Sequence, residues 1–427
     1  MKNCILFLLL TSLLPATAQI PDAVYSPRIK TVLLYPVGNQ LAMPVIQLGA
    51  VGALELHFDD LDANVKYYSY TYQLCNADWT PAMLSQFDFI RGFSQQRLTT
   101  YRLSSVAYTR YTHYQATLPE QNCVPIRSGN YILKVFLNGD TTKLIFTKRM
   151  MVVKEASAIS AQIQQPFNGQ IFRTHQKLQF KVALNEQLNV VNQFQQIHVV
   201  IMQNNRWDNA VTNIRPSFFS RNTLEYNTEN DAVFPAGKEW RWLDIRSFRF
   251  QSDRIQSAKY STAATDIIVK PDADRSPQRF NFFRDNNGMF TIETTENVNP
   301  MWQTDYATVH FSFVPANKST FPDKDVFMVG QLTGYNLDDS AKMIYNTATG
   351  AYERSLFLKQ GYYDYCYATI DHNDKKRIPS FEFTEGNYWE TENNYTILVY
   401  YRQLAGRADE LVGIATVNSL TGRQGLH

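Results

Sequence analysis

Short segments in which apolar and polar residues alternate recur along most of the chain. In residues 54–58 and 308–313 every second side chain is apolar, which is the period-2 pattern of a half-buried β-strand. Tyr68, Tyr70 and Tyr72 likewise share one face of another predicted strand. No segment carries a long apolar period of 3.6 residues, so we expect helices to be few and short. The pattern predicts an all-β protein built from tandem β-sandwich domains.

Turn-rich segments divide these strands into three predicted domains, and a length of 427 residues also suggests roughly three. We predict a first sandwich over residues 19–154, because the segment that follows its last strand has the composition of a linker. A second β-rich domain is predicted over residues 158–295, where it holds the apolar run 199–202. A third sandwich is predicted over residues 300–404, and residues 405–427 are predicted to form a C-terminal tail.

Residues 1–18 have the three parts of a secretory signal peptide. Lys2 gives a positive start, residues 4–14 form an apolar run, and Ala16-Thr17-Ala18 is a small-residue cleavage site. We therefore predict cleavage between Ala18 and Gln19, and export of the mature chain. Cys4 lies too early in the apolar run to accept a lipid. No later stretch reaches the roughly 18 apolar residues that a membrane span needs, so we expect no direct membrane insertion.

Composition agrees with a strand-rich protein and argues against highly charged partners. Aromatic residues make up 14% of the chain, and aromatic side chains favour the pleated surface of a sheet. The formal net charge is +2 at pH 7. The chain therefore offers little electrostatic attraction for nucleic acid or for an anionic membrane surface, and we predict neither as a partner.

The cysteines leave two alternatives open. Removal of residues 1–18 leaves Cys75, Cys123 and Cys366, and an odd number excludes a complete disulfide framework. Cys75 and Cys123 belong to the same predicted domain, so either a disulfide joins them in an oxidising compartment or both stay buried as free thiols. Cys366 lies within an alternating strand and is predicted to be a small core residue.

The residue patterns of catalytic and metal sites are missing from the sequence. None of the seven histidines has the i, i+2 or i, i+4 spacing of a metal pair, and there is no G-x-S-x-G, P-loop or G-x-G-x-x-G motif. We interpret the acid pairs Asp59-Asp60 and Asp338-Asp339 as solvated residues at strand ends and turns. The turn Asp285-Asn286-Asn287-Gly288 lacks the spacing of a calcium loop. The sequence thus predicts no catalytic residue, metal site, cofactor or small-molecule substrate.

Residues 304–402 resemble the early-set immunoglobulin-like modules that bind glycogen or lie beside glycosidase domains. Such modules bind ligands and do not catalyse, so the resemblance implies an alternative function as a secreted carbohydrate-binding protein. Tyr335 stands where these modules carry a sugar-stacking tryptophan, and Asp371-His372-Asn373-Asp374 replaces their acidic-Gly turn. Both departures weaken the sugar-binding interpretation. A secreted esterase or glycosidase is a third alternative, but the remaining length offers no catalytic domain for it.

Blocks of residues in all three predicted domains resemble the type IX secretion system plug proteins. Trp240, Trp242 and Leu74 depart from the family pattern, but the likeness covers nearly all of the mature chain, and the order of the blocks makes it specific. The blocks lie at residues 58–61, 72–79, 111–114 and 128–131 in the first domain, 203–210 and 237–241 in the middle segment, and 358–363 and 385–395 in the last domain.

This resemblance implies a non-enzymatic periplasmic protein. Its expected partner is the outer-membrane β-barrel translocon of type IX secretion, a barrel wide enough to leave an open aqueous lumen. The family is thought to close the periplasmic mouth of that barrel when no cargo is in transit. The resemblance therefore places the chain in the periplasm, at the inner face of the outer membrane, held there through the translocon. It does not indicate which residues form the translocon interface.

Overall fold

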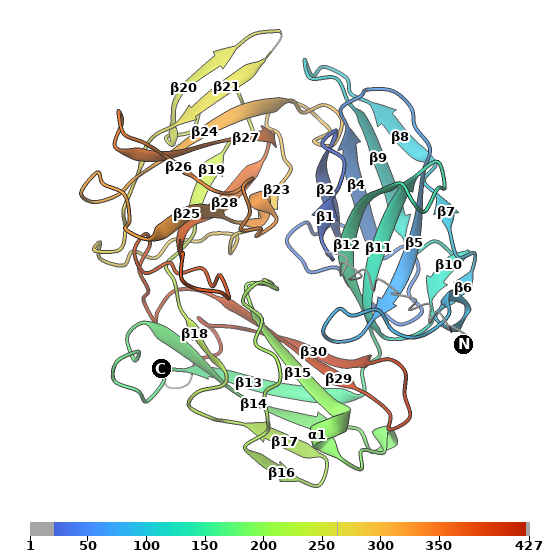
Figure 1. Cartoon of the computed structure of the whole chain (residues 1–427). Helices are drawn as coiled ribbons and strands as arrows, with labels where there is room; N and C mark the ends of the chain where they lie inside the picture. The colour runs from blue at the N-terminus through green and yellow to red at the C-terminus, as the bar shows by residue number, and fades with distance from the viewer. Residues whose placement is uncertain (1–20, 263, 424–427) are drawn as a thin grey trace, which may run out of the picture.

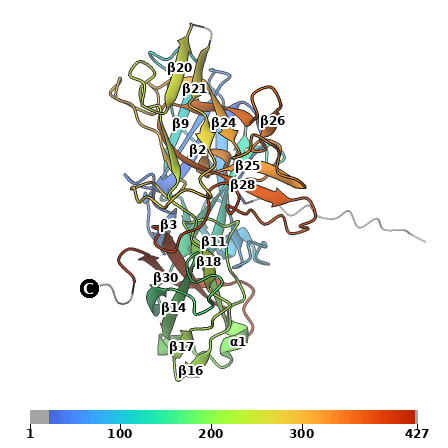
Figure 2. The ribbon, with the colours of Figure 1, turned by 90° about the vertical axis from the view of Figure 1, so that its left-hand side faces the viewer.

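The computed structural model describes residues 21–262 and 264–423, and it consists of three β-sandwiches in contact with one another (Figure 1). The all-β fold is confirmed. Seen from the side, strands β16 and β17 lie at one end of the molecule and the hairpin β20–β21 at the other (Figure 2). The predicted signal peptide and the cleavage site between Ala18 and Gln19 lie outside the described residues.

Helical segments are short, as the missing 3.6-residue period predicts. No helix within the described ranges is long and apolar enough to cross a membrane. The helical segments are α1 (Gln193–Gln196) and the 3-10 turns η1 (Gln86–Asp88), η2 (Glu186–Leu188) and η3 (Gln331–Thr333).

The first sandwich comprises strands β1 to β12. One sheet has the order β1-β12-β11-β5-β7, with β3 beside β12, and the other has the order β2-β4-β9-β8, while β6 pairs with β10. The bounds are β1 Ala23–Val24, β2 Ile29–Pro36, β3 Val45–Gln47, β4 Leu54–Asp60, β5 Tyr68–Cys75, β6 Ile90–Gly92, β7 Gln96–Arg97, β8 Thr100–Leu103, β9 Thr112–Leu118, β10 Cys123–Pro125, β11 Gly129–Leu137 and β12 Leu144–Val153.

Tyrosines fill much of the interior between these two sheets. Tyr68, Tyr70 and Tyr72 on β5 alternate into the core and are almost fully buried. Tyr114 on β9 stacks on Phe58 of β4, with ring centroids 5.0 Å apart. Fully burying a large apolar side chain stabilises a fold by about 1.5–3 kcal/mol, so this aromatic core accounts for much of the sandwich's stability.

The second sandwich begins with strands β13 to β18. One sheet has the order β13-β14-β17-β16, with β18 beside β14, and the facing sheet has the order β15-β29-β30. The bounds are β13 Ser157–Gln164, β14 His175–Leu184, β15 Ile197–Gln203, β16 Phe218–Ser220, β17 Thr223–Tyr226, β18 Val233–Pro235, β29 Asn394–Tyr401 and β30 Glu410–Asn418.

The third sandwich comprises strands β19 to β28. One sheet has the order β20-β21-β24-β27-β26, with β22 beside β24, and facing it β28 pairs with β19, β23 and β25. The bounds are β19 Arg241–Asp244, β20 Ile255–Tyr260, β21 Thr265–Val269, β22 Asp272–Ala273, β23 Phe290–Thr291, β24 Tyr306–Val314, β25 Lys324–Val329, β26 Ile344–Asn346, β27 Ala351–Lys359 and β28 Tyr362–Asp371.

The pairing of strands departs from the predicted boundaries at 158–295, 300–404 and 405–427. The third sandwich is inserted into the second, because β29 pairs with β15 from Ile197↔Tyr401 to Gln203↔Tyr395. The predicted tail instead contributes β30, which pairs with β29. The physical reason is that β15 is apolar and buried along most of its length, so it needs a neighbouring strand, and its sequence does not specify which one. Strand β19, whose residues fall within the predicted range 158–295, likewise pairs with β28 of the third sandwich.

The disulfide alternative is not realised, because Cys75, Cys123 and Cys366 are all free and buried. Cys123 belongs to the core of the first sandwich, where the even-numbered side chains of β5 also point. Cys75 is the odd-numbered residue at the end of β5. Successive side chains of a strand point to opposite faces, so its thiol faces away from Cys123.

Candidate functional site at the junctions between the sandwiches

A buried ion pair joins the first sandwich to the third. Lys359 Nζ at the end of β27 lies 2.5 Å from Asp59 Oδ2 on β4, and each residue is 1% exposed. Lys359 also donates a hydrogen bond to Met301 O at 2.6 Å, and Tyr306 OH donates to Asp59 Oδ2 at 2.6 Å. The carboxylate of Asp59 and the ammonium of Lys359 therefore come from different sandwiches, and both are buried in the interface.

Two histidines extend this network within the first sandwich. His113 Nδ1 donates to Asp59 Oδ1 at 2.7 Å, and His57 Nδ1 lies 3.0 Å from His113 Nε2. Burial lowers the pKa of His113 and lowers that of His57 to about 3, so both rings are neutral at pH 7. Burial alone would raise the pKa of Asp59, but Lys359 and His113 hold it below its usual value.

The burial of Asp59 and Asp60 corrects the expectation that this pair is solvated. Asp60 is also buried, and it accepts a hydrogen bond from Tyr68 OH at 2.9 Å. The third sandwich covers the outer face of β4, which carries Asp59, whereas Asp60 points to the opposite face, into the first sandwich. Asp338 and Asp339 are exposed in a turn, as predicted.

Apolar contacts surround the ion pair at this first junction. Leu33 and Tyr35 of β2 pack into the core cluster of the third sandwich. Leu34, between them, packs into the first sandwich's own core. One strand thus serves two cores, which fixes the two sandwiches against each other.

A second junction joins the first sandwich to the second. Met151 and Val153 on β12 share an apolar cluster with Val200 on β15 and Leu398 on β29. Tyr400 OH, in the same cluster, donates to Asn130 Oδ1 at 2.8 Å. This interface is therefore a packed core with a satisfied polar contact.

Two hydrogen bonds close the edge of the second junction. Arg402 Nη2 donates to Asn76 Oδ1 at 2.9 Å, and Ala77 N donates to Asp409 Oδ2 at 2.9 Å. Arg402 and Asp409 also pair with each other at 2.7 Å. These bonds fix the segment between β29 and β30 against the first sandwich.

The third junction lies where the chain crosses from the second sandwich to the third and back. Arg241 is buried and pairs with Glu385 at 2.9 Å and with Asp272 at 3.0 Å. Tyr365 OH and Tyr367 OH both donate to Asp272, at 2.8 and 2.9 Å. The charges of this network are therefore paired or hydrogen-bonded, as burial of charge requires.

Beside it lies a cluster of acids without a cation partner at hydrogen-bond distance. Burial, and the proximity of Asp285, raise the pKa of Glu239 to about 8 and of Asp364 to about 8. Burial raises the pKa of Asp285 itself to about 7. One side-chain oxygen each of Glu239 and Asp364 has no hydrogen-bond partner. Across residues 21–262 and 264–423, no three or more His, Cys, Asp or Glu side chains are placed to hold a metal ion.

Tyr335 does not form an exposed sugar-stacking surface. Its hydroxyl donates to Gly288 O at 3.0 Å, and its ring packs into an apolar cluster with Trp240 and Phe381. The guanidinium of Arg206 lies over the ring, 5.5 Å from its centroid. The side chain is therefore an internal contact between the second and third sandwiches.

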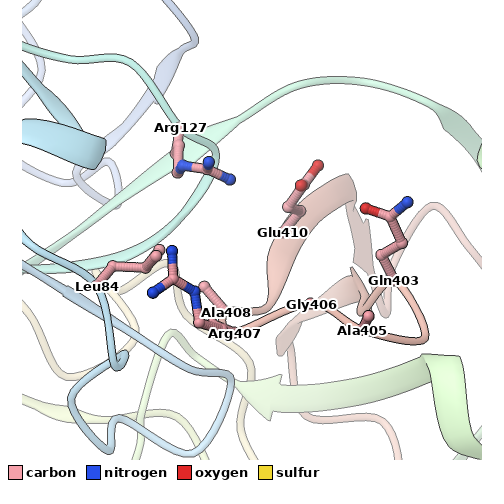
Figure 3. A pocket seen from close by; sticks show the side chains of 8 residues that line it. All are labelled: Leu84, Arg127, Gln403, Ala405, Gly406, Arg407, Ala408 and Glu410. Carbon is pink, nitrogen blue, oxygen red and sulfur yellow. The ribbon is translucent and has the colours of Figure 1, made fainter.

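A surface pocket of about 190 Å³ opens beside the second junction. Leu84 and Arg127 line it from the first sandwich. The segment between β29 and β30 supplies Gln403, Ala405, Gly406, Arg407 and Ala408, and the first residue of β30 supplies Glu410. Figure 3 shows the side chains of Arg127, Arg407 and Glu410 gathered around this space. The pocket exists only while both sandwiches keep their relative positions.

Comparison with known proteins identifies the first sandwich and confirms the overall fold. No curated protein matches the chain. The crystal structure of a hypothetical protein from Parabacteroides merdae ATCC 43184, at 2.30 Å resolution, is similar over 94% of this chain and 100% of that one, with 29% sequence identity and a TM-score of 0.88.

A family model covers most of the first sandwich. Residues 29–154 match the model described as "Type 9 secretion system plug protein 1st domain". The matched range begins at the first residue of β2 and ends one residue after β12. It includes Asp59, His113 and Asn130, which form the junctions with the other two sandwiches. The first sandwich is therefore similar to the first domain of the type 9 secretion system plug proteins.

Proposed function

We propose that the protein is a non-enzymatic periplasmic plug, which binds the periplasmic mouth of the outer-membrane type IX translocon and seals it when no cargo is in transit. The family match over the first sandwich carries the proposal, because it connects the chain with type 9 secretion. The location in the periplasm, at the inner face of the outer membrane, follows from the same proposal.

The junctions support a role that depends on shape. A sandwich of about 130 residues has a radius of gyration of about 14 Å, so three of them placed side by side can cover a wide opening. A body that blocks a pore must not bend at its domain boundaries. The ion pair Asp59–Lys359 and the contact Tyr400–Asn130 hold all three sandwiches as one unit.

The carbohydrate-binding alternative has no comparable support. The tyrosine in place of the stacking tryptophan is turned inward, against Trp240 and Gly288. Sugar stacking needs an exposed, flat aromatic face. We therefore prefer a protein as the partner.

Native purification of the translocon from outer-membrane extracts tests the proposal. We expect the protein to co-purify with the β-barrel, and a stable complex to bury about 1,600 Å² or more. Deletion of the gene should admit large antibiotics that the outer membrane normally excludes, and a plasmid copy of the wild type should restore the barrier. Secretion need not stop, because a plug is a gate. An intact barrier in the deletion strain, together with a translocon that never carries the protein, refutes the proposal.

A further inference from the structure

Exposed apolar side chains lie close in sequence to the residues that line the pocket beside the second junction. Met83 precedes Leu84 and Phe87 follows it by three residues, and the two side chains are 84% and 82% exposed. Ile126, next to Arg127, and Leu404, next to Gln403, are also exposed. Arg127 Nε donates to Asp88 O at 3.0 Å, so the residue next to Phe87 contacts a residue that lines the pocket. We call Met83, Phe87, Ile126 and Leu404, together with the residues that line the pocket, the junction patch.

The volume of the pocket suits one side chain rather than a small molecule. Ligand pockets for drug-sized molecules have volumes of about 300–1,000 Å³. A volume of about 190 Å³ lies below that range, and it leaves room for a single protein side chain. The apolar residues of the junction patch then offer area for the neighbours of that side chain.

The charges of the pocket favour a carboxylate. Arg127 and Arg407 both line it, and neither forms an ion pair within the described residues. Glu410 is the one acid among the lining residues. Arginine presents a planar set of donors that matches a carboxylate in a bidentate arrangement.

Resting on the proposed function, we propose that the junction patch is the surface that docks an acidic segment of the translocon. An Asp or Glu side chain of that segment enters the pocket between Arg127 and Arg407. An adjacent apolar side chain packs on Met83 and Phe87. Interfaces concentrate their energy in a few arginine and large apolar anchors of this kind.

This surface also makes docking depend on the whole molecule. The patch combines residues of the first sandwich with the segment between β29 and β30, which is fixed there by the bonds from Arg402 to Asn76 and from Ala77 to Asp409. A separated first sandwich would present Met83 and Phe87 without Arg407.

The test compares two sets of substitutions in the full chain. One variant carries Phe87→Ser and Arg407→Glu in the junction patch. The matched control carries Phe218→Ser and Arg221→Glu at the exposed β16 edge of the second sandwich. All four side chains are exposed, so both variants should retain the wild-type melting temperature.

Binding is measured with translocon purified from a deletion strain, at 50 and 500 mM NaCl. We expect the patch variant to bind at least about tenfold more weakly, equivalent to about 1.4 kcal/mol. We expect the control to bind like the wild type, and the salt dependence to be smaller for the patch variant because the attraction is electrostatic. A patch variant that binds like the wild type overturns the docking surface and leaves the plug proposal standing. A wild type that binds no translocon overturns both.

Discussion

Lys359→Met keeps the length of the side chain and removes the ammonium group that pairs with Asp59. In the wild type the ammonium bonds to Asp59 Oδ2 at 2.5 Å and to Met301 O at 2.6 Å. The variant leaves the Asp59 carboxylate buried, with Tyr306 and His113 as its neutral partners. The first and third sandwiches then meet over an uncompensated charge.

The expected loss follows from these contacts. Removing one partner of a buried ion pair costs about 3–5 kcal/mol, and losing the hydrogen bond to Met301 O costs about 1 kcal/mol more. Burial of the apolar methionine side chain offsets about 1–2 kcal/mol. We expect a net loss near 3 kcal/mol, which raises the unfolding equilibrium constant about 100-fold.

Urea unfolding at pH 8, followed by tryptophan fluorescence, measures this loss. Trp302 is a local reporter, because its ring centroid lies 6.3 Å from that of His113. Asp59→Asn should cost a similar amount, and the double variant should cost about 2 kcal/mol less than the sum of the two, since the residues are coupled. Lys143→Met breaks an exposed pair with Asp140 and should leave stability close to that of the wild type.

Acid should partly rescue the Lys359→Met variant. Lys359 contributes to lowering the pKa of His113, so its removal raises that pKa and lets a protonated His113 pair with Asp59. A group with a raised folded pKa stabilises at low pH and loses this contribution as pH rises through the folded pKa. The loss should therefore be smaller at pH 5.5 than at pH 8. A loss of unfolding free energy below about 1 kcal/mol for Lys359→Met at pH 8 would refute the reasoning. So would additive effects of Lys359→Met and Asp59→Asn in the double variant.

Three further predictions concern other parts of the molecule. Burial raises the pKa of Asp364 from 3.8 to about 8, so the folded protein holds a proton there that the unfolded chain releases. The wild type should therefore lose stability relative to the Asp364→Asn variant as the pH rises from 4 to 8. Urea unfolding of both proteins across that range measures the difference, and a difference that stays constant with pH contradicts the prediction. The free thiols Cys75, Cys123 and Cys366 are buried, and burial raises the pKa of Cys75 and Cys123 to about 12. A thiol reagent should therefore label none of the three in the folded chain and all three in urea. A peptide in which a disulfide links Cys75 to Cys123, found in a non-reducing digest, would count against this prediction. Tyr335→Ala should lower the unfolding free energy by about 2 kcal/mol and leave the protein's mobility in a glycogen-containing gel unchanged. If glycogen retards the wild type and the substitution abolishes that retardation, the carbohydrate-binding function is favoured over the plug.

The local pattern of apolar and polar residues is sufficient to predict where strands lie, but not which strands pair with each other. Alternation in residues 54–58, 68–72 and 308–313 predicts β4, β5 and β24, because one buried face leaves a period of two in the sequence. The continuous apolar run 199–202 also marks a buried strand. Nothing within it indicates that its neighbour is β29, since pairing depends on a strand that lies beyond an entire inserted sandwich.

The sequence did not predict the Asp59–Lys359 ion pair, because it too joins residues that are distant in the chain. Asp59 and Lys359 are separated by 300 positions in the sequence, so neither pattern nor spacing connects them. A weaker signal was present: His57 and Asp59 occupy the outer face of a strand whose inner face is apolar, and His113 is the residue that pairs with Asp59 on β9. Several ionisable side chains on one outer face can mark a surface that another domain covers.

The insertion of the third sandwich into the second has a consequence for the order in which the chain folds. The edge of β15 that pairs with β29 stays unpaired until residues 394–401 have been made, because its partner follows every strand of the third sandwich. Contacts between such distant residues form slowly, and an unpaired apolar strand is prone to aggregate meanwhile. The second sandwich is therefore the last to be completed. A chain that stops before residue 394 carries a complete first sandwich beside a second sandwich that lacks β29 and β30.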